Sequence, residues 1–90
     1  MARICLHGYV SGRVQGVGYR QHTEQQAERL ALDGWVCNRA DGRVEVLLEG
    51  EEAAVRELAV WLETGPEQAA VTSVELHEQS LQGIAGFIVR

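Results

Sequence analysis

Hydrophobic and polar residues repeat along the chain with two different periods. In residues 3–10 they alternate with a period of two, which predicts a strand that turns Ile4, Leu6 and Val10 toward the core. In residues 19–32 the period lengthens to that of a helix, which we expect to end at Gly34. The predicted buried face of this helix consists of Tyr19, Thr23, Ala27, Leu30 and Ala31.

The second half of the chain contains further alternating segments. They predict strands at residues 35–39, 43–49, 72–78 and 85–90. The dipeptide Asp41-Gly42 is a strong signal for a hairpin turn, so we place a turn at residues 40–42. We expect Gly50 to end the strand that precedes it, and residues 11–18 and 79–83 to be loops.

A second helical pattern follows Gly50. The acidic residues Glu51 and Glu52 suit the first turn of a helix, and Gly65-Pro66 is a strong stop. The predicted buried stripe of this helix is Ala54, Leu58, Trp61 and Leu62.

The predicted order of elements is strand, helix, strand, strand, helix, strand, strand. This order fits the ferredoxin-like α+β sandwich, βαββαβ, in which one antiparallel sheet carries two helices on one face. Ninety residues suffice for one core, and no linker or repeat divides them, so we expect a single domain over residues 1–90. This fold hosts many unrelated activities, so it does not supply the function.

Composition narrows the classes of partner. The chain has a net charge of −5 and a pI of about 5.1, whereas proteins that follow a nucleic-acid backbone are more often basic. No apolar run of about 18 residues is present, and no secretory signal is visible. We therefore expect a cytoplasmic protein that binds neither nucleic acid nor membrane. We also expect a monomer, although composition does not indicate the oligomeric state.

The cysteines and histidines indicate no metal centre. Cys5 and Cys37 form no Cys-x-x-Cys pair, and the three histidines are scattered. Thiols stay reduced in the cytoplasm, and the predicted strands that carry the two cysteines need not be neighbours. We expect unpaired thiols and no metal or other cofactor.

The stretch from Gly12 to Arg20 interrupts the regular patterns. It holds three glycines in seven residues, between a predicted strand and a predicted helix. Glycine adopts positive φ at little cost, so successive N–H groups can converge, and the helix start adds the positive end of its dipole. Such a turn suits a phosphate group. On these residues alone, a tight structural connection is an equal alternative.

The spacing excludes two common nucleotide loops. A nucleoside triphosphate loop needs a lysine followed by Ser or Thr, and neither follows the glycines here. A dinucleotide loop needs a third glycine where this chain has Gln21. The stretch therefore favours one small phosphate group, bound without magnesium or a nucleotide. Arg20 supports this interpretation, because an arginine beside the positive end of a helix is poorly placed without an anionic partner.

The same stretch resembles the signature of a known family. Residues 12–20, Gly-Arg-Val-Gln-Gly-Val-Gly-Tyr-Arg, are similar to the Gly-x-Val-Gln-Gly-Val-x-Phe/Tyr-Arg motif of the acylphosphatases. Residues 34–38 resemble the second motif of that family, residues 41–45 the turn and strand after it, and residues 86–90 its last strand. Cys37 departs from the pattern, because the family usually carries a basic residue there. The resemblance also implies the ferredoxin-like fold.

The resemblance implies metal-independent hydrolysis of the carboxyl-phosphate bond of small acylphosphates, which yields a carboxylate and inorganic phosphate. It implies that Arg20 holds the phosphoryl oxygens and that Asn38 orients the attacking water. We expect backbone N–H groups of the loop to complete the substrate site. These groups belong to Gln15, Gly16, Val17, Gly18 and Tyr19. The expected proton acceptor is an oxygen of the substrate's own phosphate.

Two alternatives to an enzyme remain open. One is a non-catalytic module that binds phosphate or carbamoyl phosphate, similar to domains embedded in the long chains of carbamoyl-transfer maturation enzymes. The other is an RNA-binding ferredoxin-like domain, which needs aromatic residues on central strands and a basic face; the acidic charge disfavours it. Asn38 also has a structural alternative, because its side chain can start the hairpin turn.

Overall fold

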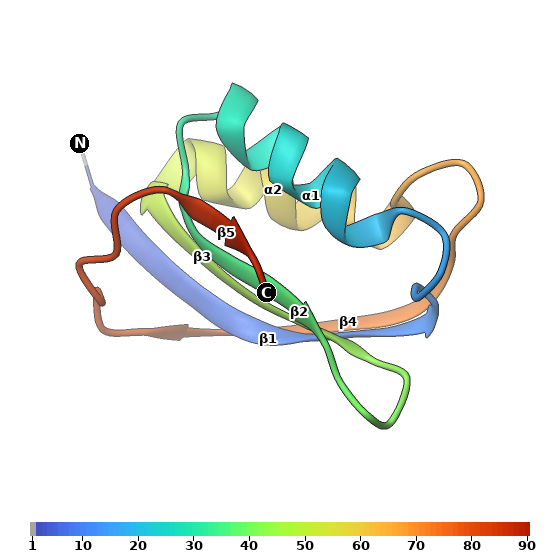
Figure 1. Cartoon of the computed structure of the whole chain (residues 1–90). Coiled ribbons are helices and arrows are strands. Elements are labelled where there is room, and N and C mark those ends of the chain that lie inside the picture. Colours follow the sequence, from blue (N-terminus) through green and yellow to red (C-terminus); the bar gives the residue numbers. More distant parts are fainter. Residues whose placement is uncertain (1) are drawn as a thin grey trace.

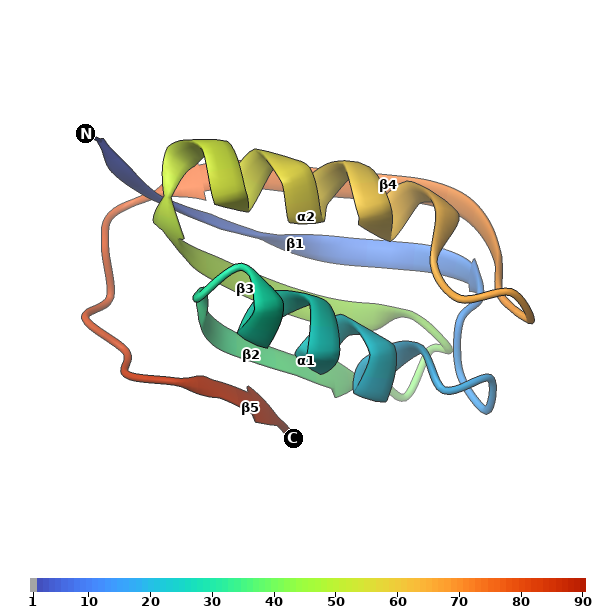
Figure 2. The ribbon, with the colours of Figure 1, turned by 90° about the horizontal axis from the view of Figure 1, so that it is seen from above.

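Two helices lie side by side across one face of a five-stranded sheet in the computed structural model, which describes residues 2–90 (Figures 1 and 2). The strands are β1 (Arg3–Arg13), β2 (Asp33–Asn38), β3 (Val44–Glu51), β4 (Ala70–Gln79) and β5 (Phe87–Val89). The helices are α1 (Tyr19–Arg29) and α2 (Glu52–Thr64). The predicted order of elements and the ferredoxin-like α+β fold are therefore confirmed.

The strands lie in the order β4-β1-β3-β2-β5. The first three pairs are antiparallel as predicted, whereas β5 is parallel to β2. The path of the chain explains this difference, because residues 80–86 run along one end of the sheet from β4 to β5 at the opposite edge (Figure 2). Since β2 begins at that same end, β5 starts in the same direction as β2.

The core lies between the sheet and the two helices. The central strands turn alternate residues inward, and Val10, Val36 and Val46 are fully buried. The helices contribute Tyr19, Thr23 and Ala27 from α1 and Val55, Leu58 and Leu62 from α2. Ala54 and Trp61, which were predicted in the buried stripe of α2, are only half-buried at the margin of this core.

β1 continues to Arg13, so residues 11–13, predicted as loop, belong to the strand. The register with β4 shifts between Ser11 and Gly12, which is the mark of a β-bulge. Gly12 has a φ of 116°, and a Cβ there would lie 2.3 Å from the carbonyl oxygen of Ala70. This glycine therefore allows a close approach of two strands and does not belong to the loop.

α1 ends at Arg29, and the predicted stop at Gly34 is wrong. Ala31 has a left-handed φ of 57° just beyond the helix. The N–H of Ala31 donates to the carbonyl of Glu28 at 3.1 Å, and the next N–H donates to the carbonyl of Ala27 at 2.8 Å. This pair of bonds is a Schellman motif, so the last two residues of the predicted helical face lie outside the helix.

Gly34 and Gly50 lie inside strands, so the predicted breaks at these positions are wrong. A Cβ at Gly34 would lie 1.8 Å from the carbonyl oxygen of Leu47, and a Cβ at Gly50 would lie 2.6 Å from Cδ2 of Leu32. Gly34 therefore allows the close approach of β3, and Gly50 makes room for the side chain of Leu32, which precedes β2. Gly65, by contrast, ends α2 as predicted.

Cys5 and Cys37 are unpaired within residues 2–90, as predicted, and β3 lies between the strands that carry them. Residues 40–42 form the turn of the predicted hairpin between β2 and β3. Neither helix in the described part of the chain is both long enough and apolar enough to cross a membrane.

Candidate active site

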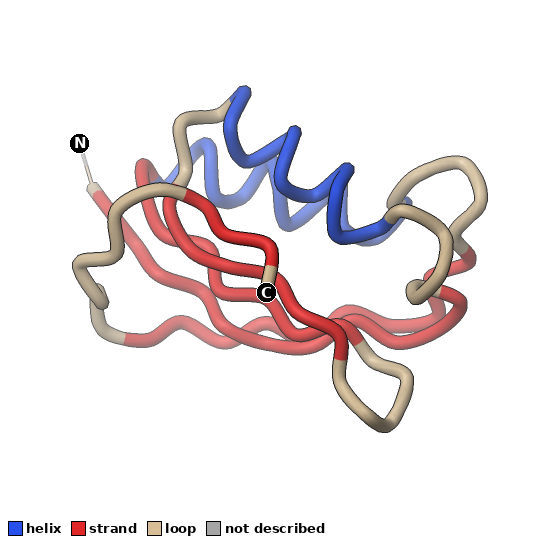
Figure 3. The backbone as a smooth tube through the Cα atoms, viewed as in Figure 1, coloured by secondary structure: helices blue, strands red, loops and turns tan. Residues whose placement is uncertain are grey.

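Residues 14–18 form a loop that joins β1 to α1 at one end of the sheet, and we call them the glycine loop (Figure 3). Two side chains fix it from inside, since Val14 is 1% exposed and Val17 is 9% exposed. Gly16 and Gly18 have left-handed φ angles of 74° and 75°, while Val17 between them does not. Alternating backbone conformations of this kind turn successive N–H groups toward a common point.

The N–H groups of this segment have no partner within the described chain. Across residues 2–90, no N–H of residues 15–19 donates to a backbone or side-chain acceptor. Gly18 caps α1 without a side-chain hydrogen bond, and the first turn of α1 contains no acidic residue. The free donors and the positive end of the helix are thus left uncompensated, which suits an anion.

Arg20 lies in the first turn of α1 and is held by the end of the last strand. Its Nη1 atom donates to the main-chain oxygen of Arg90 at 2.9 Å, and the N–H of Arg90 donates to the carbonyl of Val36 at 2.8 Å. None of the ion pairs in residues 2–90 includes Arg20. One side of the guanidinium is therefore fixed by a main-chain oxygen, and no Asp or Glu side chain within residues 2–90 pairs with it, so an external oxyanion can bind its other donors.

Asn38 is exposed at the end of β2, on the strand face that buries Val36. Arg20 is bonded to the main chain of Arg90, and Arg90 is bonded to Val36, which lies two residues before Asn38 on β2. Arg20 and Asn38 therefore come to the same end of the sheet. The hairpin turn takes its side-chain hydrogen bond from Asp41, whose Oδ1 accepts the N–H of Arg43 at 3.1 Å. This contact argues against the alternative in which Asn38 starts the turn.

The sequence analysis considered only the backbone of Gln15 and missed its side chain. The Nε2 atom of Gln15 donates to the carbonyl oxygens of Arg39 at 2.8 Å and Arg43 at 2.9 Å. These partners lie in the β2–β3 hairpin, 24 and 28 residues further along the chain. No local pattern in the sequence indicates a contact over that separation.

Tyr19 and His22 make structural contacts beside the glycine loop. The Tyr19 side chain is 1% exposed, and its hydroxyl donates to the carbonyl of Leu62 at 2.7 Å. Burial raises the pKa of Tyr19 far above its ordinary value, so we assign this phenol no role in proton transfer. The Nδ1 atom of His22 lies 2.8 Å from the carbonyl oxygen of Gly18.

Cys37 lies on the opposite face of β2 from Asn38, because side chains alternate along a strand. Its Sγ atom is 3.9 Å from Oε1 of Glu45, which also accepts from Nη1 of Arg39 at 3.1 Å. The other carboxylate oxygen of Glu45 is 2.6 Å from Nε2 of His7. The departure from the family pattern therefore falls in a polar cluster outside the proposed site.

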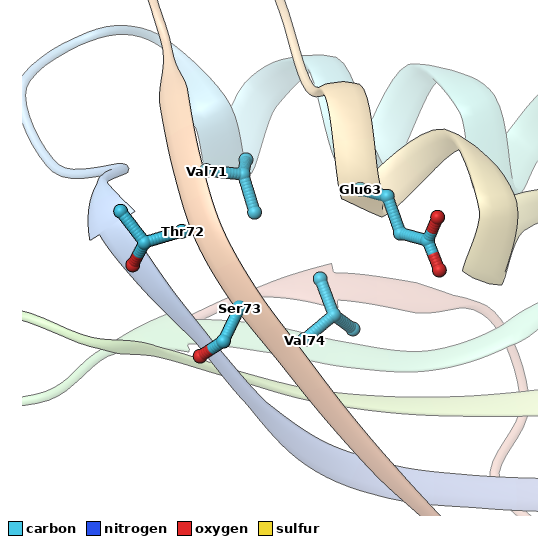
Figure 4. Close-up of a pocket in the computed structure, with 5 residues that line it drawn as sticks. All are labelled: Glu63, Val71, Thr72, Ser73 and Val74. Atoms are coloured by element: carbon cyan, nitrogen blue, oxygen red, sulfur yellow. The ribbon is translucent and has the colours of Figure 1, made fainter.

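A pocket of about 240 Å³ lies between the end of α2 and the start of β4 (Figure 4). It is lined by Glu63, Val71, Thr72, Ser73 and Val74. The Glu63 carboxylate disfavours an anion there, and none of the predicted site residues lines this pocket. A second pocket, of about 300 Å³, includes Val17 and His22 beside the glycine loop.

Within residues 2–90, no cluster of three His, Cys, Asp or Glu residues has the arrangement of a metal site.

Comparison with known proteins identifies the family. The acylphosphatase family model matches residues 6–89. An acylphosphatase of Pseudomonas paraeruginosa is 68% identical over 90 residues, which cover all of this chain and 99% of the relative. An acylphosphatase of Pseudomonas aeruginosa is 62% identical with the same coverage. The solved structure of an acylphosphatase from Coxiella burnetii is similar with a TM-score of 0.94 at 42% identity, over 98% of this chain and 93% of that one.

The sequence motifs, the fold and these relatives point to the same reaction. Two relatives above 60% identity span the whole chain, and the family model spans almost all of it. The chain therefore belongs to the acylphosphatase family and is an enzyme that hydrolyses acylphosphates to a carboxylate and inorganic phosphate.

Proposed function

We propose that residues 15–20 bind the phosphoryl group of the acylphosphate and that Asn38 orients the water that attacks it. The observation that carries this proposal is the set of N–H groups in residues 15–19 without an acceptor in the described chain, next to a guanidinium that no Asp or Glu side chain of residues 2–90 neutralises. Donors that are fixed in advance stabilise developing charge without reorganising during the reaction.

The two side chains have separate roles in this proposal. Arg20 offers two parallel donors to the phosphoryl oxygens and holds the group in line for attack. The Asn38 amide both accepts and donates hydrogen bonds, so it can fix the orientation of a water molecule. Its exposed position at the end of β2 leaves it accessible to solvent.

The chemistry requires no strong acid from the protein. The water oxygen forms a bond to phosphorus while the bond from phosphorus to the acyl oxygen breaks, and the acyl oxygen leaves as a weakly basic carboxylate. The proton of the water passes to an oxygen of the phosphoryl group. Positioning and charge complementarity then supply the rate enhancement.

We also propose that the chain works as a metal-independent monomeric domain on a small diffusible acylphosphate in the cytoplasm. All of the proposed roles come from one chain, and the guanidinium with its neighbouring N–H groups supplies the positive charge that a metal ion would otherwise bring. The net charge of −5 disfavours a nucleic-acid partner.

Hydrolysis of benzoyl phosphate in the presence of EDTA tests the metal-independent mechanism. We expect turnover to persist and inorganic phosphate to inhibit it competitively. Loss of turnover on chelation would overturn the mechanism. Phosphate binding without any turnover would instead favour the non-catalytic binding module.

Two variants separate the roles of the side chains. Arg20→Ala should weaken phosphate binding and lower the rate together, whereas Asn38→Ala should lower mainly kcat. Phosphate binding is measured as competitive inhibition of benzoyl phosphate hydrolysis. An Asn38→Ala variant that keeps its rate but binds phosphate more weakly would show that the assigned role is wrong.

A further inference from the structure

We propose that the side chain of Gln15 is a positioning residue that holds the glycine loop and Asn38 in the relative geometry that the reaction needs. This inference rests on the proposed function of both elements. It concerns the side chain of Gln15 alone, whose main-chain N–H is already assigned to the phosphate site.

The Gln15 amide joins the loop to both strands of the β2–β3 hairpin. Its Nε2 atom donates to the carbonyl of Arg39, which follows β2 directly, and to the carbonyl of Arg43, which precedes β3 directly. The N–H of Arg39 donates to the carbonyl of Arg43 at 2.8 Å, so these two residues face each other where the hairpin turn begins and ends. One side-chain amide thus fixes both ends of the hairpin turn, at Arg39 and at Arg43.

The chemistry of the partners determines the orientation of the amide. Both partners are carbonyl oxygens, which only accept, so the NH₂ end of Gln15 must face them and both of its hydrogens are used. A carboxylate or an apolar side chain of the same length at position 15 cannot make either bond. The contact is therefore specific to a side chain that carries at least two donors.

Asn38, the last residue of β2, lies between two anchor points along the chain, Val36 within the strand and Arg39 directly after it. On one side, Val36 is tied through the main chain of Arg90 to the guanidinium of Arg20. On the other side, Arg39 is tied to Gln15 at the start of the glycine loop. These two links set the position of Asn38 relative to both parts of the phosphate site.

The loss of one link should therefore change the rate more than the binding of phosphate. We expect Gln15→Met to lower kcat for benzoyl phosphate about 10- to 100-fold, since a misplacement of about 1 Å has an effect of that size. Competitive inhibition by phosphate should stay within about threefold, because the N–H groups and Arg20 remain. Gln25→Met is the matched control, since Gln25 is exposed on α1 away from the loop, and it should leave both quantities unchanged.

A second variant keeps the test informative if Gln15→Met folds poorly. Gln15→Lys retains N–H donors at a similar reach and should restore most of the lost kcat, to within about fivefold of the parent. A Gln15→Lys variant that is folded by thermal unfolding and yet falls well outside this fivefold range would overturn the inference, whether or not Gln15→Met folds.

A double-mutant cycle distinguishes positioning of Asn38 from general loosening of the site. In an Asn38→Ala background, Gln15→Met should lower kcat by a further factor of less than about three, because the residue that Gln15 positions is gone. Fully multiplicative losses would overturn the inference while leaving the role of Asn38 intact. If Asn38→Ala alone leaves kcat unchanged, the proposed function fails first, and the positioning role fails with it.

Discussion

The guanidinium of Arg20 is tied to the main chain of Arg90, which lies 70 residues further along the sequence, by a hydrogen bond of 2.9 Å. The side chain of Arg90 turns to the opposite face of the sheet, where its Cζ atom lies 4.7 Å from the centroid of the Trp35 ring. The end of the chain therefore fixes one side of Arg20, and the remaining donors of the guanidinium have no partner within residues 2–90.

Arg20→Lys should weaken phosphate inhibition about tenfold or more, although the charge is kept. A lysine ammonium is a point charge and cannot hold the main-chain oxygen of Arg90 and two phosphoryl oxygens in one plane. The measurement is competitive inhibition of benzoyl phosphate hydrolysis. Arg29→Lys is the control and should show no change, because Arg29 lies at the far end of α1 and forms an exposed pair with Glu57 of α2. Unchanged inhibition in Arg20→Lys would mean that charge alone suffices.

Gly16 and Gly83 allow a matched test of the glycine loop. Their φ angles are 74° and 72°, and a Cβ at either position would meet nothing within 4 Å. Alanine should therefore cost roughly 1–2 kcal/mol of unfolding free energy at each, from backbone strain without a clash. Only Gly16→Ala should also weaken phosphate inhibition, because only it moves the N–H groups of the site. Chemical denaturation and inhibition assays measure the two effects, and equal inhibition in both variants would contradict the role of the loop.

The sequence predicted those parts of the fold that depend on local periodicity. Tyr19, Thr23 and Ala27 are buried because residues that repeat with the helical period of 3.6 lie on one face of the helix, and that face packs on the sheet. The predicted stops at Gly34 and Gly50 failed for a physical reason. These glycines make room for Leu47 and Leu32, and such tertiary contacts leave no local signal.

The candidate site, like the fold, could be predicted from the sequence only in part. The glycine spacing indicated a loop with converging N–H groups, since positive φ is a local property of the chain. The side-chain contacts of Gln15 and Arg20 could not be predicted, because their partners are main-chain oxygens far along the sequence. A main-chain carbonyl is present at every residue, so the sequence gives no sign of which one is used.

Ala31→Gly should raise the unfolding free energy by up to about 1 kcal/mol. Ala31 carries a left-handed φ of 57° at the end of α1, where a Cβ is strained and glycine is not. The greater entropy of glycine in the unfolded chain offsets part of the gain. Ala59→Gly is the opposite control, because it lies inside α2 and should lower stability by about 1 kcal/mol. Urea denaturation of both variants measures the two signs, and a loss of stability in Ala31→Gly would contradict this account.

Glu49 should make the stability of the fold depend on pH in the acid range. It is 2% exposed, and its carboxylate accepts the N–H of Gln82 at 2.6 Å and the N–H of Gly83 at 3.0 Å. Burial by itself would raise the pKa of Glu49, but these two N–H groups, together with Cys5 and Arg3, hold it below its ordinary value. Because the folded state has the lower pKa, ionised Glu49 stabilises the fold above the pKa of the unfolded chain. This contribution is lost as the pH falls through the folded pKa.

Glu49→Gln should therefore lower the unfolding free energy at pH 7 by roughly 1–3 kcal/mol, because an amide oxygen can replace only part of the charged acceptor. The deficit should shrink as the pH falls through the lowered pKa of Glu49, where the parent protein loses the same charge. Urea denaturation of both proteins from pH 7 to pH 3 measures this change. Glu57→Gln, at an exposed pair, should show little difference at any pH. A deficit in Glu49→Gln that stays constant down to pH 3 would mean that the shape of the side chain, and not its charge, holds residues 82 and 83.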